Sequence, residues 1–352
     1  MQISRLLAAT AAATTFALLA SPGLAAEAVP TAQAPSAVTA QAAASGTSVR
    51  FATFNVRTSR ADRGTSRHWL RRALSVAREI KSRNPGIVAV QELGPGRADG
   101  KVGKINGATR QTESLVKALK SVGAGKYRLA RTTAYIRPGV THSTQGARIL
   151  YDTSKYRLIS KCRETTGYLN YSGTCNLDMP IRKSDGESRR RSAAYAEFED
   201  KNTGKNFFVI SVHLDERHSG KLSYEKSYDA LRAAQVRTVY TRLAKFIGSK
   251  PVILGGDINS WRTKAGSHAP YNYLYSKGFR DSTKAATKID ARYPTVNHWK
   301  STLKMNAPGR QVALDVVVVK RAKSFRSYEN VMKVKDTSRP SDHNMVVSNL
   351  VI

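Results

Sequence analysis

Eight short apolar segments are the feature that most limits what this chain can fold into. Each is apolar throughout or alternates apolar with polar positions, and each is bounded by turn residues, as β-strands are. They are VRFATFNV, GIVAVQEL, ARILYD, SAAYAEFED, NFFVISVHL, PVILGGDI, ALDVVVVK and NMVVSNLVI. Residues 147–214 are nearly all strand and loop, which argues against a simple alternation of strand and helix. The pattern predicts two packed sheets with helices outside them.

Two segments have the periodicity of helices. One is SRHWLRRALSVAREIKSRN, between the first two strands, and the other spans roughly Ser223 to Phe246, with Gly248 as a C-terminal stop. In the first segment the apolar residues that recur at helical spacing are Leu70, Leu74, Ala77 and Ile80. We expect this stripe to face a sheet.

The first 47 residues differ in composition from the rest. Arg5 precedes an uncharged apolar run, and small residues suited to cleavage follow, so residues 1–26 are predicted to be a signal peptide of a secreted protein. The run is short for a membrane span, and a retained N-terminal anchor is the alternative. Residues 27–47, rich in Ala, Pro, Ser and Thr, are expected to form a flexible linker. Residues 48–352 show no second break and are expected to form one domain.

Charge and cysteine content bear on partners and compartment. The chain has 58 Lys and Arg against 25 Asp and Glu, a formal net charge of +33. A polyanion is the expected partner, with nucleic acid, an anionic membrane or a cell wall as candidates. Cys162 and Cys175 are the only cysteines, and no Cys or His lies near them at zinc-ligand spacing. In an exported protein we expect them to form a disulfide.

Polar side chains recur where the apolar strands end. Asp257 and Asn259 follow Gly255 and Gly256, which we expect to turn the backbone tightly. Residues two apart on an extended chain face the same side, so the carboxylate and the carboxamide should meet at one spot. Asp315 lies among apolar residues, where a carboxylate needs a partner. The other polar residues at strand termini are Asn55, Gln91, Glu92, His213, Asp215, Ser341, Asp342 and His343.

Each of these residues has a structural explanation when taken alone, such as capping a turn. Together they place carboxylates, histidines and asparagines at the ends of central strands, which in layered α/β proteins meet at a shared crevice. An oxygen-rich set with few histidines and no cysteine suits Mg²⁺ or Mn²⁺ rather than zinc.

The motifs FNVR, VQE, VHLD, GGDIN and SDH, in this order between Phe51 and His343, resemble those of the endonuclease/exonuclease/phosphatase family. GDIN together with a terminal SDH is the specific part of the resemblance. Deoxyribonuclease, apurinic-site endonucleases, bacterial sphingomyelinases and inositol-polyphosphate phosphatases belong to this family. The resemblance implies an α/β (α+β) fold, a four-layer sandwich in which two packed mixed β-sheets are flanked by helices, with residues 48–352 as the catalytic domain.

The resemblance also implies a metal site. Glu92 would be the main ligand of Mg²⁺ (or Mn²⁺), with Asn55 beside it. Asp342 would complete the metal shell. Asp257 would activate the attacking water or bind a second metal, and one or two metals remain possible.

Roles in proton transfer and phosphate binding follow from the same resemblance. His343 would be a general base or a phosphate stabiliser, with Asp315 as its orienting carboxylate. The choice of base between His343 and Asp257 stays open. His213 would stabilise the transition state or protonate the leaving oxygen. Asn259 would donate to a phosphate oxygen.

One position departs from the family pattern. Deoxyribonuclease-like members place a carboxylate near TQGARILYD to orient the first histidine, and this chain has Gln145 there. Glutamine accepts a hydrogen bond but does not stabilise an imidazolium as a carboxylate does, which weakens a general-acid role for His213. Arg148 is a candidate phosphate contact, and a solvated strand residue is its alternative role.

The family does not determine the substrate. The positive charge favours a secreted, metal-dependent nuclease that hydrolyses DNA or RNA phosphodiester bonds, with Tyr135, Arg137 and the basic segment 97–110 bordering the groove. The alternatives are a sphingomyelinase-type phospholipid phosphodiesterase, which should carry an exposed aromatic hairpin, and a non-catalytic polyanion-binding module. We expect a monomer without stable membrane insertion.

Overall fold

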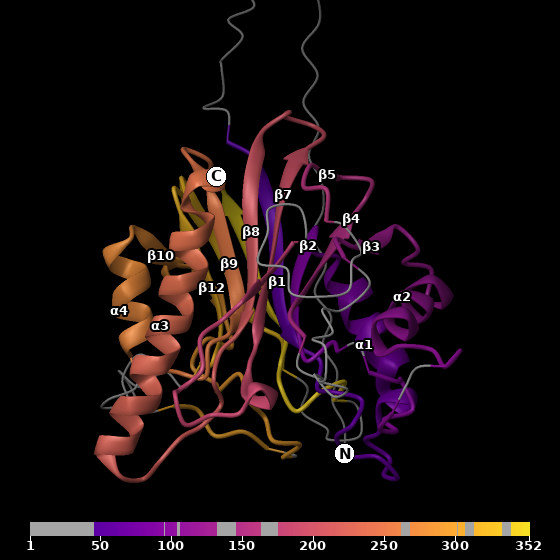
Figure 1. The fold of residues 1–352 in the computed structure, drawn as a ribbon. Coiled ribbons are helices and arrows are strands. Elements are labelled where there is room, and N and C mark those ends of the chain that lie inside the picture. The colour runs from indigo at the N-terminus through magenta and orange to yellow at the C-terminus, as the bar shows by residue number, and fades with distance from the viewer. Residues whose placement is uncertain are drawn as a thin grey trace, which may run out of the picture. The chain divides into compact units, whose positions relative to one another are not determined.

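Two mixed β-sheets form the centre of the protein, as the computed structural model shows (Figure 1). The first contains β1 (Ser48–Asn55), β2 (Ile87–Gln91), β3 (Tyr127–Leu129), β4 (Arg148–Asp152), β11 (Thr287–Ile289), β13 (Ser324–Asn330) and β14 (Val346–Val351). The second contains β5 (Tyr156–Leu158), β6 (Asn176–Asp178), β7 (Ser192–Asp200), β8 (Asn206–His213), β9 (Val252–Asp257), β10 (Phe279–Asp281) and β12 (Asp315–Lys320). The strand orders are β11-β13-β14-β1-β2-β4-β3 and β10-β12-β9-β8-β7-β5, with β6 also paired to β7. All eight predicted strands are present.

The structure describes residues 46–94, 96–103, 106–131, 146–162, 175–261, 268–300, 302–306, 313–332 and 339–352. The predicted signal peptide and all but the last two residues of the predicted linker lie outside these ranges, as do Tyr135, Arg137, Gln145 and two residues of the basic segment. Thr47 already belongs to the folded unit, because its backbone exchanges hydrogen bonds of 2.9 and 3.0 Å with Ile352.

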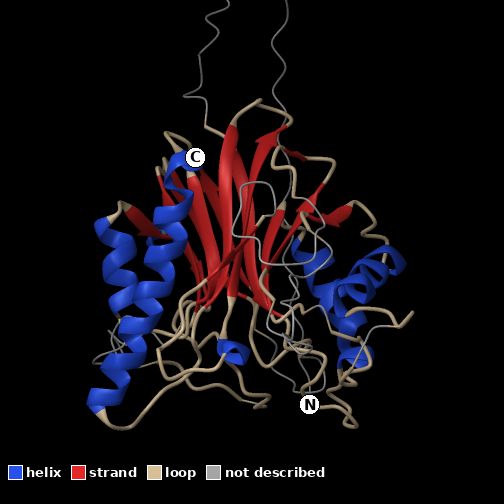
Figure 2. Ribbon diagram, viewed as in Figure 1, coloured by secondary structure: helices blue, strands red, loops and turns tan. Residues whose placement is uncertain are grey.

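Helices cover both outer faces of the paired sheets (Figure 2). They are α1 (Trp69–Arg83), α2 (Gln111–Ser121), α3 (Leu222–Ile247) and α4 (Ala269–Ser276). Three clusters of buried apolar side chains fill the three spaces between the layers: α1 and α2 on the first sheet, sheet on sheet, and α3 and α4 on the second sheet. The four-layer sandwich is therefore confirmed. Within the described residues, no helix has both the length and the apolarity needed to cross a bilayer.

Helix α1 buries only part of the predicted stripe, because Ala77 and Ile80 face the sheet but the two leucines do not. Leu70 and Leu74 are 55% and 41% exposed, whereas Trp69, Ala73 and Ile80 are buried against the first sheet. Trp69 offers far more apolar surface than leucine, so packing the indole inward sets the rotation of the helix. The longer helix agrees with the prediction to within one residue at each end, and Gly248, with φ of 52°, is its C-cap.

The glycines before Asp257 do not turn the chain, contrary to our expectation. Strand β9 continues through them to Asp257 and pairs with β8 and β12 along its whole length. A Cβ atom on Gly255 would lie 2.6 Å from Cε1 of Phe51 and 2.9 Å from Cβ of Ala89, both in the opposite sheet. Gly255 therefore permits close approach of the two sheets where β9 crosses β1 and β2.

Strand register brings the polar strand ends to one end of the sandwich. His213 is opposite Asp257 in the parallel pair β8–β9, and Asp257 is opposite Asp315 in the antiparallel pair β9–β12. In the first sheet Asn55 is opposite Gln91. Long loops gather at the same end, the lower end in Figure 2. The two sheets thus contribute side chains to a common location.

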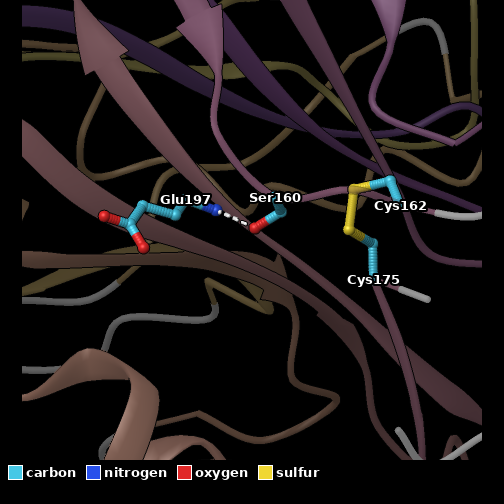
Figure 3. The surroundings of a disulfide bond; sticks show 4 residues. All are labelled: Ser160, Cys162, Cys175 and Glu197. Atoms are coloured by element: carbon cyan, nitrogen blue, oxygen red, sulfur yellow. Dashed lines mark hydrogen bonds between the residues drawn. A yellow bond between two sulfur atoms is a disulfide. The ribbon is translucent and has the colours of Figure 1, made fainter. Parts of the chain in front are cut away.

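Cys162 and Cys175 form the expected disulfide (Figure 3). Both are almost fully buried in the cluster between the sheets. Beside it, the Glu197 backbone N–H donates to Ser160 Oγ at 2.8 Å, which ties the segment after β5 to β7. The disulfide therefore joins the segment that follows β5 to the segment that precedes β6, both at the edge of the second sheet.

Removing this disulfide should lower stability by a measurable amount. The cysteines are 13 residues apart, and for a loop of this size the chain-entropy model gives about 3 kcal/mol. We expect the double variant Cys162→Ala/Cys175→Ala to lose about that free energy of unfolding in urea titrations. Two free thiols in the denatured, non-reduced wild type would contradict the pairing.

Gly255→Ala should also destabilise the fold, because the added methyl group clashes with the opposite sheet. Overpacking of this kind costs about 1–3 kcal/mol. Gly220→Ala is the matched control, since a Cβ there meets nothing within 4 Å. The measurement is the urea midpoint of both variants; equal midpoints would show that the sheets are not closely packed at Gly255.

Candidate active site

Two histidines and two carboxylates form a buried cluster at the strand ends. His343 Nδ1 lies 2.9 Å from Asp315 Oδ2, and His343 Nε2 lies 3.8 Å from Asp257 Oδ2. The same Asp257 oxygen is 3.4 Å from His213 Nε2. All four residues are less than a tenth exposed. The cluster is therefore a continuous chain of titratable groups shielded from water.

The loop before β14 carries His343 into this cluster. Ser341 Oγ donates to the Asn55 carbonyl oxygen at 2.7 Å, which fixes the loop against the end of β1. The Asn297 backbone N–H donates to the Asp342 carbonyl oxygen at 2.7 Å, and its side-chain amide donates to the Ser341 carbonyl oxygen at 3.1 Å. These contacts explain why a histidine outside any strand has a defined position.

The environment separates the protonation states of the cluster. Burial, helped by the charge of Asp315, raises the pKa of Asp257 to about 7. Burial by itself lowers the pKa of His343, but the carboxylates of Asp315 and Asp257 outweigh it, so that this pKa lies well above its usual value. Burial, with the positive charges of Arg191 and His343, holds the pKa of His213 well below its usual value. His213 is thus neutral near pH 7, whereas His343 forms an ion pair with Asp315.

Asn55 links the two sheets at the site. Its Nδ2 donates to Glu92 Oε1 at 3.1 Å and to Asp257 Oδ2 at 3.0 Å. The Arg57 backbone N–H donates to Asn55 Oδ1 at 3.0 Å, and the Thr58 backbone N–H donates to Glu92 Oε2 at 2.9 Å. An amide nitrogen is a donor and not a cation ligand, so in this geometry Asn55 positions the two carboxylates instead of presenting its oxygen to a metal.

Arg57 is a site residue that we did not predict. Its guanidinium forms ion pairs with Asp342 and Asp62 and is also attracted by Glu92. Its backbone has φ of 56°, a left-handed conformation that is costly for a non-glycine residue. The FNVR motif contains this arginine, but the sequence does not show where its side chain points, because that depends on the left-handed turn.

The predicted metal ligands are distributed over two adjacent groups. Among the described residues, Asp257, Asp315 and His343 offer ligand atoms within 4.8 Å of one another. Glu92 and Asp342 are not in that group and are connected through the Arg57 cation. Carboxylate oxygens that already attract a cation fit a hard divalent ion such as Mg²⁺ or Mn²⁺. Glu92, Asp342 and Asp257 would hold it.

Asn259 lies beside Asp257 but not through the extended geometry that we expected. The strand ends at Asp257, and Asn259 has φ of 48°. Its backbone N–H donates to Asp257 Oδ1 at 3.1 Å, and its Nδ2 donates to the Leu214 carbonyl oxygen at 3.0 Å. Within the described part of the chain Nδ2 makes no other hydrogen bond, so its second hydrogen could donate to a phosphate oxygen and the predicted role is compatible with the position.

His213 and Arg148 differ in how well they fit their predicted roles. Nδ1 of His213 is buried without a hydrogen-bond partner within the described part of the chain, and Gln145 lies outside it.

Arg148 is only 3% exposed, so its alternative role as a solvated strand residue is wrong. It lines a small crevice between the sheets with Arg131 and Asn176. Contact of Arg148 with phosphate stays a prediction.

The family model described as the endonuclease/exonuclease/phosphatase family matches residues 52–343. This range contains all the site residues discussed above, from Asn55 to His343. A search of curated proteins finds no significant match.

Solved structures share the fold at low sequence identity. An endonuclease/exonuclease/phosphatase from Bacteroides vulgatus is 19% identical, with a TM-score of 0.61, and the match covers 86% of this chain and 98% of that one. A mannosyl-6-phosphatase from Bacteroides thetaiotaomicron is 18% identical, with a TM-score of 0.58 and coverages of 86% and 100%. D. rerio TDP2, complexed with single-strand DNA product, is 16% identical, with a TM-score of 0.54 and coverages of 86% and 99%.

At these identities the solved structures show the fold alone, and membership rests on the family model, which spans most of the chain. The chain belongs to the endonuclease/exonuclease/phosphatase family, whose members include nucleases, phosphatases and phosphodiesterases.

Proposed function

We propose that this protein is a secreted, metal-dependent phosphodiesterase that cleaves nucleic acid by water attack. The observation that carries the proposal is the convergence of the His343–Asp315 pair with Asp257 and with the Asn55–Glu92 contact at one end of the two sheets. Phosphodiester hydrolysis needs a proton acceptor and groups that neutralise charge on phosphate oxygens, and this cluster contains both.

His343 is the proton acceptor in this proposal once its imidazolium has lost its proton, so its raised pKa implies that activity increases as the pH rises. Its Nδ1 is held by Asp315, so Nε2 is the nitrogen left to take a proton from water. Asp315 fixes the tautomer and stabilises the imidazolium that forms. Asp257 Oδ2 lies 3.8 Å from His343 Nε2, so its carboxylate is the alternative proton acceptor at this place.

The remaining groups serve the phosphate. His213 is neutral and donates through Nε2–H, which agrees with the absence of an orienting carboxylate from its described surroundings. Asn259 supplies an amide hydrogen. Mg²⁺ or Mn²⁺ held by Glu92, Asp342 and Asp257 would neutralise the non-bridging oxygens. Each residue thus has a distinct task around one phosphate.

Charge near the site supports a polymeric nucleic acid as substrate. The loop that follows β1 carries Arg60 and Arg63 at exposed positions, and Arg71 is exposed in the first turn of α1. Arg67 lies over the ring of Trp299 at 5.2 Å from its centroid, and Trp299 belongs to the loop that contacts Asp342. Exposed cationic side chains near a site are typical of surfaces that track a phosphate backbone.

Asp315→Asn should lower kcat and shift the pH profile. An asparagine amide would donate to His343 Nδ1 and leave the proton on Nε2, and a change of this kind costs about 10⁴-fold in kcat. Loss of the negative charge also lowers the pKa of His343, so the acid limb of the profile should move to lower pH. The measurement is kcat/KM against pH, with Glu199→Gln, in a surface ion pair with Arg157, as control. An unchanged acid limb would assign the base role to Asp257.

Substrate class is tested with supercoiled plasmid, RNA, sphingomyelin and a sugar phosphate, each with Mg²⁺ and with a chelator. We expect metal-dependent cleavage of the polymers, with KM rising steeply with salt, by a slope of about 0.9 per neutralised duplex phosphate. The chemical step at saturation should change much less.

Glu92→Gln is the matched variant for this experiment, because it keeps the shape of the side chain and removes one charge from the metal site. We expect it to stay folded and to lose turnover by orders of magnitude. A flat salt dependence for both polymers, or cleavage of the small ester or lipid alone, would overturn the nuclease proposal.

A further inference from the structure

A second polar pocket lies at the end of the sandwich opposite the catalytic cluster. It has a volume of about 540 Å³, within the range of small-molecule sites. Ser48, the first residue of β1, lines it, whereas Asn55, the last residue of β1, contacts Asp257 of the buried cluster. Seven residues of extended strand separate the two by about 23 Å. The pocket is therefore a separate site.

Cationic side chains dominate the lining of this pocket. Arg50, Lys155, Lys201 and Arg326 contribute four positive charges, and Asp200 contributes the single negative charge, which leaves a net charge of +3. Asp200 Oδ1 accepts the backbone N–H groups of residues 202 and 203, both at 2.9 Å, so this carboxylate stabilises the turn between β7 and β8. The balance of charge favours an anionic ligand.

Two of the cations are held in place by the protein itself. Arg50 Nε donates to the Arg83 carbonyl oxygen at 2.6 Å, and its Nη1 donates to Asn349 Oδ1 at 3.1 Å. Lys201 Nζ donates to the Thr153 carbonyl oxygen at 2.7 Å. Side chains positioned before a ligand arrives lose less conformational entropy when it binds.

Arg326 enters the pocket lining through an irregularity in β13. The register against β14 shifts between Phe325 and Ser327, so Arg326 is the extra residue of a β-bulge. Bulges re-aim a side chain relative to the regular alternation of a strand. Lys155, in the turn between β4 and β5, is exposed on the other side of the lining.

Tyr156 supplies a neutral donor. The residue is only 3% exposed, and its ring lies so close to Gly86 that a Cβ there would be 2.6 Å from Cε2. Tyr156 is one of the residues that line the pocket. Burial, then the charges of Asp200 and Asp152, raise the pKa of this hydroxyl, so it keeps its proton. A protonated hydroxyl in the lining of the pocket can donate a hydrogen bond to a bound anion.

We propose that this pocket binds a phosphate group through Arg50, Lys155 and Arg326, with the Tyr156 hydroxyl as a further donor. Guanidinium groups suit phosphate because they offer paired N–H donors in a plane. Two sources carry this chemistry: a free mononucleotide, and a phosphate of a nucleic-acid strand bound along the protein. The site is independent of the reaction proposed at the other end of the sheets.

The test is titration calorimetry of the mature protein with inorganic phosphate and with adenosine 5′-monophosphate, at low salt and in the presence of a chelator. Lys155→Ala/Arg326→Ala should weaken binding of both probes by about tenfold or more, because each removes a charge-assisted contact. Lys288→Ala/Lys323→Ala is the matched control, since it removes two exposed charges outside the pocket lining. Its affinity should equal that of the wild type.

Tyr156→Phe separates binding from structure. If the hydroxyl serves a ligand, this variant binds the probes several-fold more weakly, while its Tm without ligand stays equal to or above that of the wild type. A lower Tm with unchanged affinity would mean that the hydroxyl is structural. Equal losses of affinity in the pocket variant and in the control would mean that only general charge is involved. Either result would overturn the proposal.

A third probe distinguishes the two sources of phosphate. A single-stranded oligonucleotide should lose affinity and salt slope in Lys155→Ala/Arg326→Ala if the pocket holds part of a strand. If only the mononucleotide responds, the ligand is a free nucleotide. Both results support the phosphate site, and neither depends on catalysis, because the chelator stops turnover in every arm.

Discussion

The amide group of Asn55 is the interaction on which the arrangement of the site depends. Its nitrogen donates to Glu92 at the end of the first sheet and to Asp257 at the end of the second. The donor and acceptor atoms of a hydrogen bond lie only about 3 Å apart, so the two sheets must be close together at this point. Gly255 makes that possible two residues earlier in β9, where any side chain would meet Phe51. A packing constraint between the sheets is thus a precondition for the chemistry at their edge.

In the buried cluster, burial and neighbouring charges shift the pKa values of similar side chains in opposite directions. His213 and His343 are both enclosed, yet their pKa values move in opposite directions, because Asp315 contacts His343 directly and the nearest charges to His213 include Arg191. Asp257 contacts both histidines, and its own pKa is raised to about 7. Two histidines and two aspartates therefore supply a neutral imidazole, an imidazolium–carboxylate pair and a carboxyl group with a raised pKa.

The sequence predicted the four-layer fold and most of the residues at the strand ends, since a polar residue after an apolar strand is a local signal. Asn55, His213 and Asp257 were found in this way. Contacts between distant segments left no such signal. The prediction of a turn at Gly255 was wrong because the sequence does not show the ring of Phe51 against which this glycine packs. Arg57 was missed because its direction is set by a left-handed backbone.

The chain enters and leaves the folded unit at neighbouring positions. Thr47 and Ile352 are joined by two backbone hydrogen bonds, at the end of the sheets away from Asn55 and Asp257. Natural domains with adjacent termini tolerate circular permutation. A short peptide could join these two ends here, and new termini could be opened in the surface loop at Gly220, where the surroundings leave free space. The order of the strands along the chain would change, but the hydrogen-bonded order of the strands in each sheet would not.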